Sequence, residues 1–448
     1  MKVVITGATG LLGRNFIFEL IKRNLEQLDS LDLVILGRAD AAGANLATRM
    51  REIICSEGAV YMGLDPKQSA LLEDFCIQQL RFVPLDLMDI DTGDVAAAIG
   101  PGRIDGFFHI AAMLDFRDTD WVTQQLEIAN VLGTEHILKI VSTLNVDSFS
   151  YVGSAYSCGN STGLIAPDHG DFSLHFRNPY EISKLKAESL VKRWSEISGV
   201  PCYIFRPSTI SGRLIEPTLG AIHKFDVFYA WGAFFLRMKL KLLGSPTEHR
   251  SKRVSMDVRV LYRPDAGLNI VPADFAAKAM LQAWEHGRPG SYHLVNNQET
   301  LHSSYLWMIL EAIGVDGLTQ VDAIPTELNP LEKIYYKTVG KIYTPYTVSE
   351  PMLFDTSNIR PILDQAGLSC PPVDEKNLRI LLDYAVQNDF GMSLNEEHPS
   401  PRDSAVLNVL QPAIIGIASQ LPSEGPAYWP RLDALVNSGN PPALPGRQ

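Results

Sequence analysis

Cysteine and the common metal-binding motifs are scarce in this chain of 448 residues. Its five cysteines form no Cys-x-x-Cys pair, which excludes a cysteine-built zinc site and suits a reducing compartment. Its ten histidines include no His-Glu-x-x-His motif, so we expect no catalytic metal. No signal-peptide pattern precedes the first strand-like run, and no apolar run reaches the roughly 18 residues of a membrane span. We therefore expect a cytoplasmic protein with no transmembrane span.

Positive charge is also in short supply. The chain has 39 Lys and Arg against 51 Asp and Glu, a formal net charge of -12. Nucleic-acid binding depends on Lys and Arg contacts with phosphates, so we expect no nucleic-acid partner. Hydrophobic residues make up 46% of the chain, enough for a large buried core, and the length favours two domains.

Strand-like and helix-like patterns alternate over residues 1–210. The strand-like runs are continuous rather than alternating in hydrophobicity, which is typical of strands covered on both faces. We therefore predict an α/β protein: a doubly wound parallel sheet with a smaller, partly helical C-terminal domain. The expected division is 1–210 plus a returning segment at about 265–290 for the sheet domain, 211–264 and 291–400 for a substrate domain, and 401–448 for an apolar segment and Pro-rich tail.

Three glycines in the stretch VITGATGLLGR follow the first predicted strand. A glycine-rich turn between a strand and a helix lets the backbone approach a pyrophosphate, whose charge the helix N-terminus stabilises. We assign Gly7 to the turn, Gly10 to the close approach and Gly13 to the contact between helix and strand. The absence of a lysine after Gly13 argues against a P-loop. A dinucleotide-binding Rossmann unit is therefore predicted, with a plain tight turn as the alternative.

The end of the second predicted strand indicates which dinucleotide binds. An acidic residue there would bond the ribose hydroxyl of NAD, whereas this chain presents Arg38, which suits the 2′-phosphate of NADP(H). Arg49 is a candidate second phosphate contact, and a solvated helix-face arginine is an equally good interpretation. We expect NADP(H) as the cofactor.

Tyr180 and Lys184 stand four residues apart in NPYEISKLKAESL, so on a helix they share one face. An ammonium beside a phenol should lower its pKa from about 10 toward neutrality, as proton exchange at working pH requires. Ser154 ends the predicted strand of YVGSAYS, and its hydroxyl could polarise a carbonyl oxygen. We predict Ser154, Tyr180 and Lys184 as catalytic residues.

With these three pieces in order, the sequence resembles the extended short-chain dehydrogenase/reductase superfamily, a group of NAD(P)-dependent oxidoreductases. The resemblance also rests on the stretches PLDLMD, FFHIAA, NVLGT and FRPSTISG. It implies that Asp86 contacts adenine, that Asn130 braces the central helix and that Arg206 lies alongside the nicotinamide. The full set of expected cofactor-binding residues is Thr6, Gly7, Thr9, Gly10, Leu11, Leu12, Gly13, Arg38, Arg49, Asp86, Leu87, Ala111, Ala112, Asn130, Tyr180, Lys184, Arg206, Pro207, Ser208 and Ile210.

Within the superfamily, the stretches LGRAD, ATRM and RPSTISG are most similar to thioester-reducing members: fatty acyl-CoA reductases and carrier-protein reductase domains. That resemblance implies hydride transfer from NADPH to an acyl thioester, or to a lipophilic aldehyde or ketone, with a carrier protein as a candidate partner. Sugar-nucleotide epimerases or dehydratases and hydroxysteroid-type dehydrogenases share the motifs and remain alternatives, as does a non-catalytic cofactor-binding protein. Members commonly pair through two long helices, so a homodimer stays open.

Three further segments have more than one interpretation. Residues 225–244 combine six aromatic residues with Arg and Lys, which fits a lipophilic substrate wall, an interfacial helix or, slightly better, a buried helix. Residues 405–421 are apolar but broken by Pro412, and plain packing is favoured over a lid or a subunit contact. Residues 333–346 repeat Tyr and Lys, as a phosphate-binding or an ordinary solvated face would.

Overall fold

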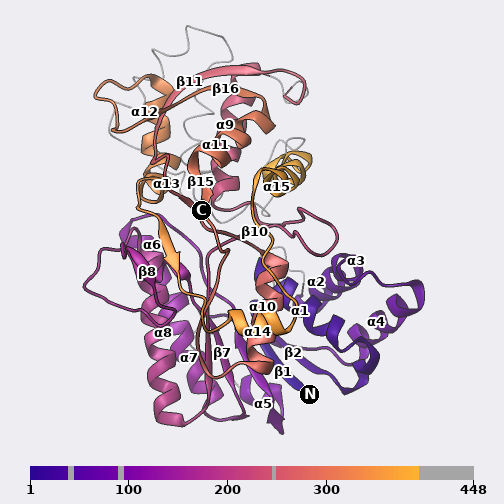
Figure 1. Cartoon of the computed structure of the whole chain (residues 1–448). Coiled ribbons are helices and arrows are strands. Elements are labelled where there is room, and N and C mark those ends of the chain that lie inside the picture. Colours follow the sequence, from indigo (N-terminus) through magenta and orange to yellow (C-terminus); the bar gives the residue numbers. More distant parts are fainter. Residues whose placement is uncertain (39–44, 89–94, 245–248, 393–448) are drawn as a thin grey trace, which may run out of the picture.

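A seven-stranded parallel sheet organises the larger part of the molecule (Figure 1). The computed structural model describes residues 1–38, 45–88, 95–244 and 249–392. The strand order is β14-β9-β7-β5-β1-β2-β3, and every neighbouring pair is parallel. The strands are β1 (Lys2–Thr6), β2 (Asp32–Gly37), β3 (Arg81–Pro84), β5 (Gly106–His109), β7 (Phe149–Val152), β9 (Cys202–Pro207) and β14 (Gly290–Leu294). The predicted doubly wound α/β class is confirmed.

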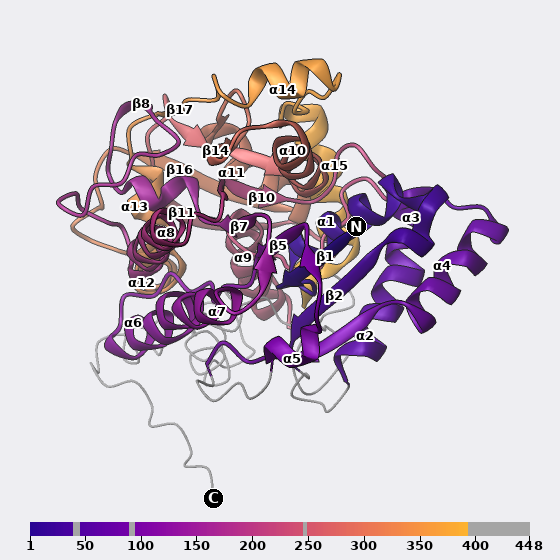
Figure 2. The same ribbon diagram turned by 90° about the horizontal axis from the view of Figure 1, so that it is seen from below.

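Helices cover both faces of this sheet, which is why its strands read as continuous apolar runs (Figure 2). One face packs against α1 (Leu11–Arg23), α2 (Leu46–Ile53), α3 (Ala59–Met62), α4 (Pro66–Gln78), α10 (Ala273–His286) and α14 (Arg360–Gln365). The other packs against α5 (Val95–Ile99), α7 (Gly133–Val141) and α8 (Pro179–Ser198). The central helix α6 (Asp120–Leu126) runs into α7 through a widened π-helical turn, η3 (Glu127–Leu132).

A second hydrophobic core lies beyond the carboxyl ends of the strands (Figure 1). It is built by α9 (Phe228–Leu243), α11 (His302–Ile313), α12 (Pro330–Lys337), α13 (Val339–Thr347) and α15 (Glu375–Gln387), together with the pair β11 (Val254–Leu261) and β16 (Val315–Val321). Short pairs join the two parts: β8 (Gly163–Ile165) with β17 (Met352–Phe354), β10 (Thr209–Ser211) with β13 (Ile270–Pro272), and β12 (Gly267–Leu268) with β15 (Thr300–Leu301). The remaining elements are β4 (Arg103–Ile104), β6 (Asn145–Val146), η1 (Leu25–Ser30), η2 (Ile54–Gly58), η4 (Ala155–Cys158) and η5 (Asp389–Gly391).

The aromatic segment 225–244 is a core helix. Trp231 is 1% exposed, and its indole nitrogen donates to the hydroxyl of Tyr335 at 3.3 Å. Lys239 is 1% exposed as well, and its ammonium donates to the backbone oxygen of Ile313 at 2.6 Å. The interpretations of this segment as a substrate wall or an interfacial helix are therefore wrong, because its aromatic side chains pack inside the second core.

Strand β14 and the segments 333–346 and 401–448 also bear on the domain division and the segments predicted from the sequence. Strand β14 belongs to the main sheet, so the returning segment extends beyond the boundary expected at residue 290. Residues 333–346 belong to α12 and α13: Tyr335 and Tyr343 are buried, while Lys337 and Lys341 are exposed, so only the lysine side of the segment is a solvated face. Residues 401–448, with the apolar run 405–421, lie outside the described residues. Among those that are described, no helix is both long and apolar enough to cross a membrane.

Replacing Trp231 tests the second core. Trp231→Ala should lower the free energy of unfolding by about 3–5 kcal/mol, because a large buried ring leaves a cavity. Trp307 on α11 is 54% exposed, so Trp307→Ala should change it by no more than about 0.5 kcal/mol. Denaturant titration of the full chain measures both values, and equal effects of the two substitutions would contradict the assignment of 225–244 to the core.

Candidate functional site

The glycine turn after β1 is packed against the loop after β5. Gly7 adopts a left-handed backbone with φ of 78°, and a Cβ there would lie 2.5 Å from the backbone nitrogen of Ala111. A Cβ on Gly13 would lie 2.2 Å from the carbonyl oxygen of Gly7. Helix α1 begins with no side-chain cap and no acidic residue in its first turn. The amides of that turn are therefore available to an anion, as the glycine spacing predicts.

Thr6 and His109 brace the same turn from within. The hydroxyl of Thr6 lies 2.8 Å from Nδ1 of His109 and accepts a bond from the backbone N–H of Ala111 at 3.3 Å. Burial and, to a lesser extent, the charge of Lys184 together lower the pKa of His109 to about 3. The imidazole is therefore neutral at physiological pH. Thr6 was predicted to contact the cofactor. Its buried hydroxyl instead contacts His109 and the loop after β5, so the side chain binds protein groups.

Arg38 and Asp86 face each other at the ends of β2 and β3. Their side chains approach to 3.8 Å, and that of Arg38 is 70% exposed. The Asp86 carboxylate also accepts the backbone N–H of Met88 at 3.0 Å. Arg49 on α2 lies close enough to Arg14 for its charge to lower the pKa of that guanidinium, behind the larger effect of burial. An accessible cation thus stands at the edge where an adenosine phosphate would be expected.

Ser154, Tyr180 and Lys184 come from two elements that meet at the carboxyl end of the sheet. Ser154 follows β7, and its Oγ accepts the backbone N–H of Tyr156 at 3.2 Å. Asn178 caps α8 by accepting the N–H of Glu181 at 3.1 Å, which places Tyr180 in the first turn and Lys184 one turn later. The order and helical face predicted from the sequence are therefore present.

The charge state of this group differs from the prediction. Burial raises the pKa of Tyr180 above its usual value, and the charge of Glu181 adds to the rise. Burial lowers the pKa of Lys184 to about 7. The ammonium of Lys184 lies 4.5 Å from the ring centroid of Tyr151, a cation–π contact. The sequence prediction of a Tyr180 pKa lowered toward neutrality is therefore wrong for this arrangement, because burial of the phenol has the largest effect on it and raises the pKa.

Phe116 packs against Tyr180 and begins a series of ring contacts that leads to Tyr346 and Tyr156. Phe116 meets the Tyr180 ring edge-on at 5.4 Å and the ring of Tyr346 at 6.2 Å. Tyr346 in turn meets Tyr156 at 5.7 Å and donates a hydrogen bond to Glu181 at 2.8 Å. Tyr346 belongs to α13, so the second core reaches the catalytic helix. The tyrosine-rich segment 333–346 was the only signal for it in the sequence.

Asn130 braces the site, as the resemblance implies, but its side chain does not reach toward a cofactor. It lies in the widened turn η3, accepts the N–H of Met113 at 2.7 Å and donates to the Met113 oxygen at 3.0 Å. Its amide also donates to Ser183 at 3.0 Å, next to Lys184. Its expected role as a cofactor contact is corrected, because both ends of the amide bind protein groups.

Arg206 requires a similar correction. Its side chain is fully buried and donates to the Glu188 carboxylate at 2.8 and 2.6 Å, so the guanidinium does not line a cofactor groove. Ser208 donates its hydroxyl to Asn269 at 2.7 Å. The other expected cofactor contacts differ in exposure. Pro207 and Leu12 are buried, Ala112 is exposed, and the half-buried ones are Thr9, Leu11, Leu87, Ala111 and Ile210. Their contact with a cofactor stays a prediction.

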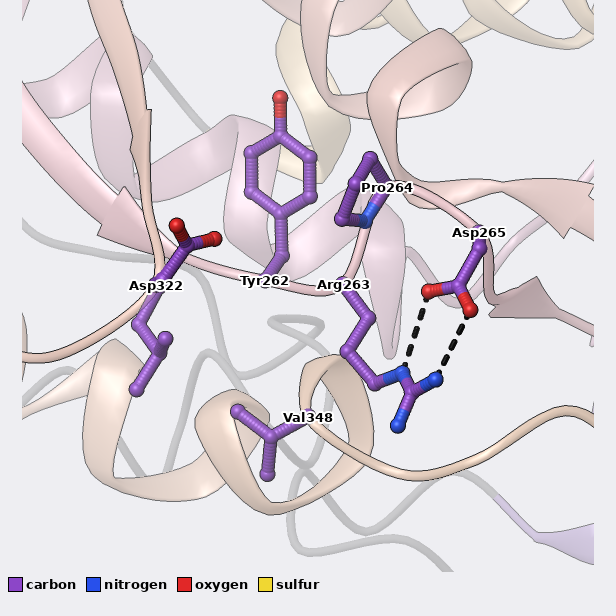
Figure 3. Close-up of a pocket in the computed structure, with 7 residues that line it drawn as sticks. Tyr262, Arg263, Pro264, Asp265, Asp322 and Val348 are labelled. Carbon is purple, nitrogen blue, oxygen red and sulfur yellow. Dashed lines mark hydrogen bonds and ion pairs between the residues drawn. The ribbon is translucent and has the colours of Figure 1, made fainter.

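A hollow of about 570 Å³ lies at the ends of β11 and β16, and none of the three predicted catalytic residues lines it (Figure 3). Arg263 and Asp265 point toward each other there and form an ion pair of 2.8 Å, while the Tyr262 ring points away from them. Asp322 lines the hollow outside this ion pair. Because none of the predicted catalytic residues lines the hollow, it adds no catalytic group to the candidate site.

A family model described as "Male sterility protein" matches residues 5–280. A component of the linear gramicidin synthase of Brevibacillus parabrevis is 22% identical over 85% of this chain and 7% of its own length. The L-2-aminoadipate reductase large subunit of Eremothecium gossypii is 23% identical over 81% of this chain and 25% of its own length. The chain thus spans a quarter or less of these two relatives.

Solved structures share the fold. The terminal R domain from the myxalamid PKS-NRPS biosynthetic pathway superposes with a TM-score of 0.59 at 21% identity, covering 88% of this chain and 92% of that one. UDP-glucuronic acid 4-epimerase from Bacillus cereus, in complex with UDP-glucuronic acid and NAD, gives a TM-score of 0.54 at 15% identity, covering 86% and 99%. The resemblance to extended short-chain dehydrogenases/reductases is confirmed.

A substitution at Gly7 tests the packing of the turn. Gly7→Ala and Gly63→Ala both force alanine into a left-handed backbone, with φ of 78° and 67°, at a cost of about 1 kcal/mol each. Only at Gly7 does the new Cβ meet backbone, since nothing lies within 4 Å of it at Gly63. Gly7→Ala should therefore weaken dinucleotide binding by at least about tenfold, measured by fluorescence titration. Equal binding by the two variants would contradict the role of the turn.

Proposed function

This chain belongs to the male sterility protein family, of the extended short-chain dehydrogenase/reductase type, and on that premise we propose that it is an NADPH-dependent reductase of acyl thioesters. The observation that carries this is the extent of the likeness. The gramicidin synthase and aminoadipate reductase relatives match 85% and 81% of the chain in sequence, so that likeness includes the second core as well as the sheet, whereas the epimerase shares the fold at 15% identity. A shared fold alone does not fix a substrate, so a sequence likeness that extends beyond the sheet supports the proposal more than one confined to it.

The residues present fit a nicotinamide dinucleotide. The uncapped first turn of α1 and the bare backbone of Gly10 would hold the pyrophosphate, and Arg38 would bind the 2′-phosphate of NADPH. Asp86 stands beside Arg38 and would contact the adenosine. When bound, NADPH supplies the hydride that reduces the carbonyl carbon.

The chain's own residues would handle the carbonyl oxygen. Ser154 and Tyr180 would hold this oxygen, and the phenol of Tyr180 would give it a proton as negative charge develops there. The resulting hemithioacetal would return that proton to the phenolate, re-form the carbonyl and break the C–S bond, which releases the aldehyde and a thiolate that takes a proton from water. The raised pKa of Tyr180 keeps the phenol protonated, which suits a proton donor in reduction. Lys184 stabilises the phenolate that remains, and it would bind the nicotinamide ribose. Asn130 keeps α8 in register with the loop at Met113 by its bonds to Met113 and Ser183.

The aromatic surround of Tyr180 supports an apolar acyl group over a sugar. Phe116, Tyr156 and Tyr346 bring rings to the neighbourhood of the phenol, and the Glu181 carboxylate there is already bonded to the Tyr346 hydroxyl. Apolar surface favours a hydrocarbon chain beside the thioester carbonyl, whereas a sugar would leave its hydroxyl groups unpaired. We further propose that the thioester is presented on a carrier protein.

A substrate panel tests the reaction class. NADPH with long-chain acyl-CoA and with carrier-bound acyl groups should give aldehyde and a loss of NADPH absorbance. Tyr180→Phe should lower the rate by about 10²–10⁴-fold while NADPH binding stays unchanged, because only the proton donor is lost. Tyr203→Phe removes the same hydroxyl at the opposite end of the sheet, from β9, and should keep the wild-type rate.

Nucleotide sugars belong in the same panel. Turnover of these compounds without net oxidation of cofactor would replace the proposal by an epimerase or dehydratase, and reduction confined to lipophilic ketones would remove the thioester part of it.

Arg38 tests the choice of dinucleotide. Arg38→Met should raise the KM for NADPH by about 10–100-fold and leave the KM for NADH nearly unchanged, because a charge-assisted contact with the 2′-phosphate is lost. Arg379→Met removes an exposed arginine on α15 and should alter neither value. A wild-type enzyme that uses NADH as well as NADPH would contradict the role of Arg38.

A further inference from the structure

A buried carboxylate lies beneath the predicted catalytic residues, and the proposed mechanism does not use it. Glu188 stands one helical turn after Lys184 on α8, with a side chain 1% exposed. It accepts two bonds from Arg206 on β9, at 2.8 and 2.6 Å, and pairs with Lys192 at 2.7 Å. A Cβ on Gly153 would lie 3.2 Å from the same carboxylate, so the residue before Ser154 packs directly against it.

Arg206 depends on this carboxylate. Its guanidinium is fully buried, and Nη1 has no hydrogen-bond partner among the described residues. A buried cation left with a single anionic partner holds that partner firmly, because separating them would leave an uncompensated charge. Arg206 therefore fixes the position of Glu188 below α8.

Few other groups can act on the ammonium of Lys184. From β7 it meets the ring of Tyr151, from β5 the neutral His109, and on its own helix it has Tyr180 and Glu188. Arg206 on β9 is positively charged, so it cannot favour the charged form of Lys184. Glu188 is thus the carboxylate whose charge opposes the desolvation of Lys184, and it is shared with two other cations.

We propose that Glu188 is a positioning residue that keeps Lys184 charged, and that Arg206 limits this effect by sharing the carboxylate. The proposal rests on the proposed function for its meaning in catalysis, since Lys184 supports Tyr180 there. Apart from catalysis, the proposal concerns only the pKa of Lys184. It predicts opposite effects for substitutions of the two partners.

The direction of each effect follows from electrostatics. Glu188→Gln removes the attraction that favours the ammonium, so the pKa of Lys184 should fall by about one unit or more. Arg206→Met removes a competing cation and leaves the carboxylate to Lys184 and Lys192, so the pKa of Lys184 should rise. Glu196→Gln neutralises an exposed carboxylate on the same helix and should leave the pKa unchanged.

The test is a titration of ¹⁵N-labelled lysine side chains by NMR in the full chain, with the Lys184 signal assigned from its loss in Lys184→Met. Downward and upward shifts in Glu188→Gln and Arg206→Met would support the proposal. An unchanged Lys184 titration in both, or shifts of one sign, would overturn it.

Two further measurements separate this inference from folding and from the proposed function. The double variant Glu188→Gln/Arg206→Met removes the buried pair together and should stay folded, with Lys184 still titrating below the wild type. Double-variant titration at or above the wild-type value would overturn the proposal even if Glu188→Gln alone fails to fold. With an acyl thioester, the alkaline limb of kcat/KM should move with the NMR value. NMR shifts without any wild-type turnover would refute the reductase and leave the role of Glu188 intact.

Discussion

The ammonium of Lys184 is held out of water between α8 and the sheet, and the geometry of the candidate site follows from that. Desolvation disfavours the charge, and the Tyr151 ring at 4.5 Å and the Glu188 carboxylate one turn away offset part of the cost. Because these two contacts offset only part of the desolvation cost, a displacement of α8 away from them would further disfavour the charged form of Lys184. The cap at Asn178 and the bonds of Asn130 to Met113 and Ser183 hold the helix at the required height. Tyr180 is placed by the same contacts.

The second constraint is the close approach of bare backbone at the strand ends. Gly7 touches the loop at Ala111, and Gly13 lets α1 lie against the carbonyl of Gly7. The glycine turn, Ser154 after β7 and the first turn of α8 therefore share one edge of the sheet. In parallel α/β sheets this carboxyl edge is where ligands bind, so this is where we propose that a dinucleotide and a reactive carbonyl meet the same three side chains.

Short-range sequence patterns predicted which residues lie at this edge of the sheet. They did not predict side-chain contacts between different elements of the fold. The strand runs, the glycine spacing and the Tyr180–Lys184 pair are all short-range signals, and the fold class followed from them. The pairing of Arg206 with Glu188 joins residues 18 apart on a strand and a helix, so a motif match assigned Arg206 to a cofactor instead. Tyr346 reaches Glu181 across 165 positions, which no periodicity reveals. The aromatic helix at 225–244 was ambiguous because a buried stripe and a lipophilic wall have the same composition.

The second core contributes Tyr346 to the candidate site, where its hydroxyl bonds Glu181 on α8 and its ring meets the Phe116 ring that packs on Tyr180. The most direct measurement is the fate of the transferred hydride. With NADPH carrying deuterium at C4 of the nicotinamide and an acyl group bound to a carrier protein, we expect an aldehyde that contains deuterium at its carbonyl carbon, detected by mass spectrometry. Aldehyde without deuterium from either C4 position, or no aldehyde from any thioester, would contradict the proposed hydride transfer.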